Sequence, residues 1–263
     1  ASQPTLATNP TGKSALDPQT KPFTIEFHFN LPELTNDNQI ILQKLDANNG
    51  ITLSLSQSSS TSDCKLIALV SSGTNFVSAS MFVDKGKFNH IAAVVNRDAG
   101  PGAQVSLYSN AALKASSSFA TIGQISFTTA SLLVGSGTQH VYGTNTFTPQ
   151  QTLSGAMCDL RMWHTSRSQK EIRNNKGREI FAQNGLQLLF RFNEPSGSFV
   201  GGSNGLVLDY SGNALHTVTQ NLSMAQRSTS SFGASPVTET SRKSTISLFP
   251  SYQPLRNLHS DFL

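Results

Sequence analysis

The sequence feature that most constrains the fold is a long series of short segments in which apolar and polar residues alternate. These segments follow one another from about residue 23 to residue 219 and are separated by turn-forming residues. In the segment FTIEFHFN, alternation places Phe23, Ile25, Phe27 and Phe29 on one face of an extended chain. Short alternating strands with frequent turns are typical of antiparallel sandwiches and barrels. We therefore expect an all-β domain.

Two glycine-containing turns support antiparallel pairing of neighbouring strands. The segment DANNG, residues 46–50, separates IILQKL from ITLSLS, and its Asn49-Gly50 pair suits the positive backbone torsions of a tight hairpin. The segment NRDAGPG, residues 96–102, separates KFNHIAAVV from AQVSLYS in the same way. In the later segment LQLLFRF, alternation predicts inward-facing Leu186, Leu188, Phe190 and Phe192 and outward-facing Gln187 and Arg191.

The segment LSGAMCDLRMWHTSRSQKEI, residues 153–172, changes periodicity in its middle. Its first half predicts a strand with Cys158, Leu160 and Met162 on one face and Asp159, Arg161 and Trp163 on the other. Ser168 and Glu171 then form an S-x-x-E capping box, which marks the start of a helix. We expect a short helix from Ser168 to Lys176 that Gly177 closes at its C-cap. An exposed Asp159–Arg161 pair would contribute little stability.

Composition favours a protein with a polar but weakly charged surface. The chain has 263 residues, enough for one large all-β domain or two small ones. Charged residues make up 13% of it, about half of the ~25% usual in soluble globular proteins. Such a surface suits an extracellular, surface-exposed or virion-bound protein. The net charge of +4 arises without a long basic run or interleaved aromatic and basic residues, so we expect no nucleic-acid partner.

We also expect no membrane insertion, because the chain has no apolar run of about 18 residues. The N-terminal residues ASQPTLATNP lack the apolar region of a secretory signal. A chain that starts at alanine fits either removal of an initiator methionine or cleavage of a signal peptide.

The cysteines and histidines carry no recognisable motif. Cys64 and Cys158 either pair or remain buried free thiols, and the sequence leaves both alternatives open. No H-x-H or H-E-x-x-H spacing occurs among the histidines, which are His28, His90, His140, His164, His216 and His259. We therefore predict no metal site and no cofactor. His28 and His90 are expected to be hydrogen-bonded structural residues, and Cys158 a packed thiol.

Both ends of the chain differ in composition from its middle. We divide the chain into an N-terminal arm at residues 1–20, a domain at 21–222 and an extended C-terminal arm at 223–263. The arms are polar and lack periodicity, so they have few intramolecular anchors and should become ordered against neighbouring subunits. The predicted assembly contacts of the C-terminal arm are Phe249, Tyr252, Leu255, Leu258 and Phe262.

Several segments, taken in order, resemble the laminin-G-like, pentraxin-like and concanavalin A-like jelly rolls. The resemblance rests on FTIEFHFN, GKFNHIAAVV, VSLYSNAAL, SLLVGSG, LSGAMCDLRMWHTSRSQKEI, LQLLFRFNEPSGS and VLDYSGNALH, and it covers roughly residues 14 to 220. It implies a lectin-like jelly-roll sandwich of two antiparallel sheets with one short helix.

Two departures from the family pattern bear on structure and function. Ala111 replaces the family's usual glycine after Asn110, so we expect that hairpin to turn differently. The loop in which pentraxin-type relatives place calcium-binding acids reads SGTQHVYGTNTFTPQQ and has no carboxylate. Calcium prefers about six to eight oxygen ligands, usually with carboxylates among them, so this loop cannot form the family's usual calcium site.

The distribution of acids also argues against an enzyme. A glycosidase on this fold needs paired carboxylates, but no E-x-D, D-x-E or D-x-D occurs in the chain. The loop 136–151 instead offers polar and aromatic groups that suit a glycan, although an ordinary polar loop or a subunit contact explains them more simply. The candidate ligand-binding residues are Gln139, His140, Tyr142, Asn145 and Phe147.

Two hypotheses follow. In the first, the protein is a non-catalytic structural protein whose arms bind neighbouring subunits, as in a virion coat or decoration protein. In the second, it is a calcium-independent carbohydrate-binding module of a secreted or cell-surface protein. The two roles can coexist, because a decoration protein can also adhere to sugars.

Overall fold

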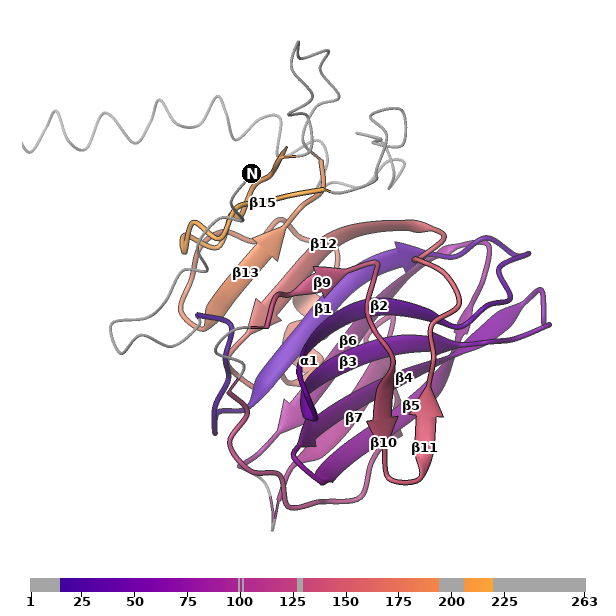
Figure 1. The fold of residues 1–263 in the computed structure, drawn as a ribbon. Helices are drawn as coiled ribbons and strands as arrows, with labels where there is room; N and C mark the ends of the chain where they lie inside the picture. Colours follow the sequence, from indigo (N-terminus) through magenta and orange to yellow (C-terminus); the bar gives the residue numbers. More distant parts are fainter. Residues whose placement is uncertain (1–14, 99, 101, 127–129, 194–205, 220–263) are drawn as a thin grey trace, which may run out of the picture.

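A computed structural model describes residues 15–98, 100, 102–126, 130–193 and 206–219, and these residues form two antiparallel sheets packed face to face (Figure 1). The six-stranded sheet has the order β13 (Leu186–Phe190), β12 (Ala156–Trp163), β1 (Phe23–Asn30), β6 (Phe88–Asn96), β7 (Gln104–Ser109) and β8 (Ala112–Ser116). The five-stranded sheet has the order β5 (Asn75–Asp84), β4 (Asp63–Ser72), β3 (Asn49–Ser56), β2 (Gln39–Asp46) and β9 (Leu133–Val134). The predicted all-β sandwich is confirmed.

Two small hairpins accompany these sheets. One consists of β10 (His140–Tyr142) and β11 (Asn145–Phe147), and the other of β14 (Leu206–Val207) and β15 (Thr217–Val218). The part of the chain that the structure describes contains one α-helix, α1 (Gln169–Asn175), which is far too short to cross a membrane.

The main core lies between the inner faces of the two sheets. Phe23, Ile25, Phe27 and Phe29 of β1 are all buried in it, as the alternation predicts. Apolar residues of β3 and β4 belong to the same cluster, so the apolar face of each sheet is removed from water by the other. This shared burial is the main force that holds the sheets together.

The outer face of the six-stranded sheet is also covered. Ile172 of α1 packs with Ala92 and Val94 of β6, and Trp163 forms a further cluster with Ile180, Leu186 and Leu189. The prediction that Leu186 joins the main core is therefore wrong, because a register shift between Met162 and Trp163 places it beside Trp163.

Arg191 also departs from its predicted outward position. Only 6% of its surface is exposed, because it pairs with Glu179 of the segment that follows α1. Alternation predicts that Arg191 faces solvent, but the segment that contains Glu179 covers this edge of the sheet and buries it.

Strand β12 contains a bulge that the sequence did not reveal. Thr24 pairs with Trp163 and Glu26 with Arg161, but His28 pairs with Cys158, so one extra residue of β12 lies opposite Phe27. Asp159 has a positive φ of 53° within this irregular stretch. A bulge reverses the alternation on one side of itself.

The bulge overturns the predicted placement of Cys158. The thiol lies not with Leu160 and Met162 in the main core but on the outer side, near His28 and Asp159. The predicted exposed Asp159–Arg161 pair is also wrong, because both side chains are buried beneath the segment that contains α1.

The turn between β2 and β3 differs from its prediction. Asn49 and Gly50 belong to β3, and the residue with a positive φ is Ala47, at 52°. Gly50 is needed for a different reason: a Cβ built on it would lie 2.4 Å from the Lys44 carbonyl oxygen. The glycine permits close packing of two backbones rather than a left-handed turn.

The hairpin between β7 and β8 keeps a two-residue turn despite its alanine. Asn110 and Ala111 have positive φ values of 52° and 66°, which are those of the usual hairpin turn. The expectation that Ala111 would force a different turn is wrong. Its methyl group is buried beside Ile172 of α1, which offsets the cost of its backbone conformation.

Helix α1 begins as predicted. The Ser168 side chain accepts a hydrogen bond from the Glu171 backbone, and the Glu171 side chain accepts one from the Ser168 backbone, so the capping box is confirmed. The C-cap is Lys176 rather than Gly177, and its N–H donates to the Ile172 carbonyl.

Both predicted arms lie largely outside the described residues. Residues 15–20 are described and lie against the sandwich, with Leu16 in the main core. The predicted anchors Phe249, Tyr252, Leu255, Leu258 and Phe262 are outside the described residues, and the proposed domain boundaries stay predictions.

Candidate functional site

Strand β5 presents a row of aromatic and hydroxyl groups on the outer face of the five-stranded sheet. Alternation sends Val77, Ala79, Met81 and Val83 into the core. The residues between them are therefore directed outward, and the described part of this row reads Phe76, Ser78, Ser80 and Phe82. β5 is an edge strand of its sheet, and among the described residues no further strand is hydrogen-bonded to its free side.

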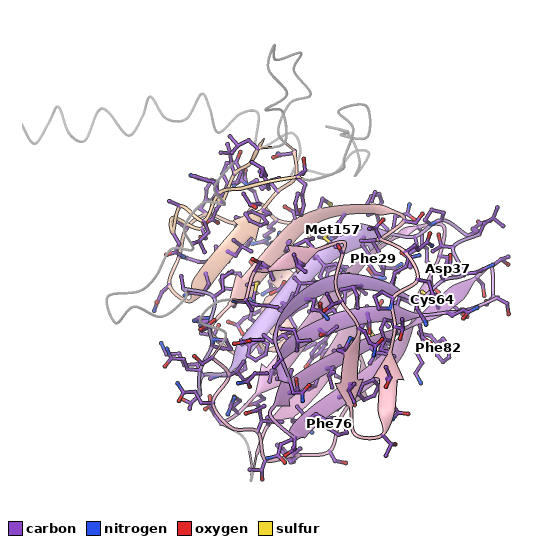
Figure 2. All side chains as sticks on the ribbon, viewed as in Figure 1. Phe29, Asp37, Cys64, Phe76, Phe82 and Met157 are labelled. Carbon is purple, nitrogen blue, oxygen red and sulfur yellow. The ribbon has the colours of Figure 1, made fainter. Side chains whose placement is uncertain are left out.

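Phe82 is the most unusual member of the row because 68% of its surface is exposed. Its neighbour across the sheet is Lys65, which is also exposed. In Figure 2, Phe76 and Phe82 mark two separated places on this sheet, and Phe82 projects beyond its rim. An aromatic ring that is largely exposed, and so is not needed to fill the core, is available to contact a ligand.

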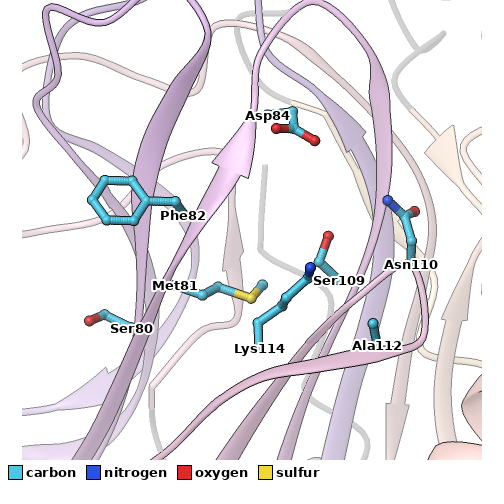
Figure 3. A pocket seen from close by; sticks show the side chains of 8 residues that line it. All are labelled: Ser80, Met81, Phe82, Asp84, Ser109, Asn110, Ala112 and Lys114. Atoms are coloured by element: carbon cyan, nitrogen blue, oxygen red, sulfur yellow. The ribbon is translucent and has the colours of Figure 1, made fainter.

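A groove of about 540 Å³ runs beside β5, where the edges of the two sheets approach each other. This volume falls in the range of small-molecule sites. Figure 3 shows Met81, Ser109 and Lys114 directed toward one another across the gap, with Phe82 on the other side of β5. The lining residues are Ser80, Met81, Phe82, Asp84, Ser109, Asn110, Ala112 and Lys114.

The charges in the groove are solvent-accessible and partly neutralised. Asp84 forms an ion pair with Lys87, in which Lys87 Nζ lies 2.9 Å from Asp84 Oδ2. No such pair occurs for Lys114 among the described residues, and Lys114 is exposed. The groove therefore offers an ammonium group, an amide and hydroxyls next to apolar surface.

The hairpin β10–β11 contains four of the five loop residues that the sequence selected, and it lies over the outer face of the five-stranded sheet (Figure 1). The preceding loop is tied to this sheet by Gln43 of β2, whose side chain accepts a hydrogen bond from the Thr138 backbone at 2.7 Å. At the hairpin, the rings of Tyr142 and Phe76 meet edge to face with 6.0 Å between centroids.

The five predicted ligand-binding residues do not form one surface. His140 and Phe147 are buried and stack with 5.1 Å between ring centroids, so they pack the hairpin. Burial lowers the pKa of His140. Gln139 and Asn145 are exposed, and Tyr142 is half-buried against Phe76. Of the five predicted residues, Tyr142 contacts the β5 row through its ring contact with Phe76.

Sequence reasoning missed the β5 row itself. Its signal is the F-x-S-x-S-x-F spacing from Phe76 to Phe82, which alternates like any other strand in the chain. Alternation does not tell which strand lies at an edge or how much of an outer face a distant hairpin covers. The candidate site on β5 therefore becomes apparent only from the order of the strands in the sheet.

A second group of polar side chains is buried between the six-stranded sheet and the segment that contains α1. Glu26 lies at its centre: its carboxylate is 3.0 Å from Arg167 Nε, 3.4 Å from His90 Nε2 and 3.9 Å from Arg161 NH1. Arg161 also donates to the carbonyls of Asn175 and Arg178. These interactions hold the cover onto the sheet.

The bulge of β12 adds a compact trio to this group. One ligand-type atom from each of His28, Cys158 and Asp159 lies within 4.8 Å of the others, and all three residues are buried. Burial, together with His90 and Arg161, lowers the pKa of His28 to about 2. Burial also raises the pKa of the Cys158 thiol. Cys64 and Cys158 are both free thiols, which answers the question of their pairing.

The fold and the order of these strands agree with a known superfamily. Residues 6–173 match the family model of the concanavalin A-like lectin/glucanases superfamily. The chain belongs to this superfamily. No curated protein matches the chain in sequence.

Solved structures of this superfamily's fold are similar to the chain at low sequence identity. A putative carbohydrate binding protein from Bacteroides ovatus superposes with a TM-score of 0.54 and 17% identity, over 77% of this chain and 53% of that one. The chain thus spans about half the length of that protein. A heptameric SAP-like pentraxin from Limulus polyphemus has a TM-score of 0.42 and 17% identity, over 60% of this chain and 70% of that one. Such similarity concerns the fold alone.

Proposed function

We propose that this protein is a non-catalytic, calcium-independent carbohydrate-binding module and that edge strand β5 carries its binding site. The observation that supports this proposal is the row of Phe76, Ser78, Ser80 and Phe82 beside a groove of about 540 Å³. An aromatic face packs on the C–H surface of a sugar ring, and hydroxyl and amide groups bond to its hydroxyls. The row supplies both kinds of contact along one strand.

The length of the row favours an oligosaccharide over a single sugar. Phe76 and Phe82 are separated by six residue steps, and a strand rises roughly 3.3 Å per residue, so the two rings lie on the order of 20 Å apart along the strand. A ligand that contacts both rings must extend along β5. Phe76 and Phe82 would then each contribute to the affinity for the oligosaccharide.

The groove favours binding over hydrolysis. Among the described residues that line it, Asp84 carries the one carboxyl group. Retaining hydrolysis needs two carboxyl groups about 5–5.5 Å apart. The fold neighbour from Bacteroides ovatus, described as a putative carbohydrate binding protein, adds support to a binding role.

A glycan array of the full chain, with and without a calcium chelator, tests the proposal. We expect binding that chelation leaves unchanged. Titration calorimetry with the strongest glycan should then show that Phe82→Ala weakens binding roughly twofold to tenfold, because one aromatic contact contributes about 0.5–1.5 kcal/mol.

Phe181→Ala provides the matched control. Phe181 is 59% exposed and lies outside the β5 row and the groove, so its loss should leave affinity unchanged. Absence of binding to any glycan would contradict the proposed function. An equal loss of affinity in both variants would contradict the assignment of the site to β5.

A second proposal concerns assembly. The weakly charged composition and the polar segment 223–263 support a role in which the arms bind neighbouring subunits, as in a virion coat or decoration protein. Deletion of residues 223–263 should abolish assembly into particles, while a chain with this segment scrambled controls for its length. Normal assembly and retention of the shortened chain would exclude the role of the arm.

A further inference from the structure

We propose that His28, Cys158 and Asp159 form a buried site for a transition-metal ion of the zinc class. One ligand-type atom of each residue lies within 4.8 Å of the other two, and His28 Nδ1 is 3.9 Å from Asp159 Oδ2. Zinc binds nitrogen, sulfur and oxygen at about 2.0–2.3 Å, so tetrahedral ligand atoms lie roughly 3.3–3.8 Å apart. Side-chain movements of about 1 Å would close the trio around an ion.

The bulge gives this trio its geometry. His28 and Cys158 are direct partners across β1 and β12, and Asp159 is the extra residue next to that pair. Uninterrupted alternation from Leu160 would have turned Cys158 into the apolar core. Bulges often re-aim side chains at functional sites, and this one gathers three different ligand types at one place.

The surroundings support a ligand role for His28. His28 makes a hydrogen bond with the backbone of Lys176, and a histidine that binds a metal commonly uses its other ring nitrogen in such a bond. The ring of His90 lies 4.7 Å from that of His28, and its Nδ1 has no hydrogen-bond partner among the described residues. A polar occupant beside His90 would lessen the cost of burying that nitrogen.

The ligand set indicates the chemical class of the ion. A thiolate and an imidazole with a single carboxylate favour zinc or a similar borderline-soft ion over calcium or magnesium, which prefer oxygen ligands. Asp159 and the Cys158 thiolate would supply two negative charges to a divalent ion. The thiol proton is released to solvent when the ion binds, so acid should weaken the affinity.

Arg161 lies near the trio but is held by the cover. Its NH2 atom is 4.0 Å from Asp159 Oδ2, but its guanidinium donates to the carbonyls of Asn175 and Arg178. Arg161 therefore has fixed partners on the cover, and Asp159 would bind the ion through a carboxylate oxygen.

Cobalt is the probe for this site because its thiolate complexes absorb light. The full chain is refolded with Co²⁺, and the absorption of thiolate-to-cobalt charge transfer and the bound metal per chain are measured. We expect one ion per chain, displacement of cobalt by added Zn²⁺, and a higher melting temperature with either ion. Cys158→Ala and Asp159→Asn should abolish the absorption or weaken cobalt binding at least tenfold.

Cys64→Ala is the matched control, since Cys64 is the other cysteine of the chain and is equally buried. Its absorption should equal that of the unmodified protein. Cys158→Ser keeps the size of the side chain and replaces Cys158→Ala if the latter does not refold, as judged by circular dichroism. The proposal is overturned if the refolded protein binds no cobalt, if the signal survives in folded Cys158 variants, or if it requires Cys64.

Discussion

At the scale of single residues, two turns show how backbone conformation and side chain are matched. Gly73 has a positive φ of 65°, and a Cβ at that position would meet open space. Ala47 has a similar φ of 52° in an exposed turn but carries a methyl group. A left-handed conformation costs a residue with a Cβ about 1–2 kcal/mol, so the alanine turn is strained and the glycine turn is not.

Ala47→Gly should therefore stabilise the protein. Glycine increases the entropy of the unfolded chain, but relief of the left-handed strain in the folded protein is larger. The free energy of unfolding should therefore rise by up to about 1 kcal/mol. Gly73→Ala is the reciprocal variant and should lose a similar amount. Urea unfolding measures both; a loss of stability in Ala47→Gly would show that this turn carries no such strain.

The half-buried imidazole of His164 should make stability depend on pH. Burial lowers its pKa from 6.5 to about 4, so the unfolded chain binds a proton between these values while the folded protein does not. The free energy of unfolding should thus fall as the pH drops from 6.5 to 4, by about 1.4 kcal/mol per pH unit from this group. His164→Gln should flatten that part of the profile of urea midpoint against pH. An unchanged slope in the variant would refute this assignment.

At the scale of elements, the sequence predicted the strands and the helix better than their faces. The alternation of β1 and the capping box of α1 were both visible, because each depends on residues close together in the chain. The bulge at Asp159 depends on how β12 pairs with β1, which is a long-range property. The same limit hid the exposure of Phe82, because edge position depends on the order of the sheet.

The capping box should matter more for α1 than for a longer helix. This helix has seven residues, and helices of that length are marginal on their own. Ser168→Ala removes a side-chain acceptor from the helix start and should cost about 1 kcal/mol. Lys170→Ala, at an exposed position of the first turn, should change the stability little. Equal urea midpoints for the two variants would show that the box contributes nothing.

At the scale of the whole molecule, the sandwich and its superfamily were predictable, whereas the contacts that tie distant segments together were not. Lys44 and Asp17 illustrate this difference. Both side chains are fully buried, and Lys44 Nζ lies 3.6 Å from Asp17 Oδ1, so the segment before β1 is fastened to the five-stranded sheet. Alternation places Lys44 on the same inward face as Leu42, but it does not reveal that Asp17, far away in the sequence, is the partner of this lysine.

Asp17→Asn should destabilise the protein by roughly 3–5 kcal/mol, because the ammonium group of Lys44 would stay buried without its carboxylate. Asp84→Asn breaks a pair of similar chemistry whose side chains are more than half exposed, and it should change stability far less. Chemical denaturation of both variants gives the comparison. Similar losses of stability in the two variants would mean that burial does not determine how much these ion pairs stabilise the protein.

In genetic terms, the bulge of β12 amounts to one inserted codon. Without Asp159, every pair from Thr24–Trp163 to Asn30–Ala156 could be kept in an uninterrupted ladder. A deletion elsewhere in β12 would instead turn part of the strand over. A one-residue length difference at this position would therefore separate relatives that carry the His–Cys–Asp trio from those with a plain strand.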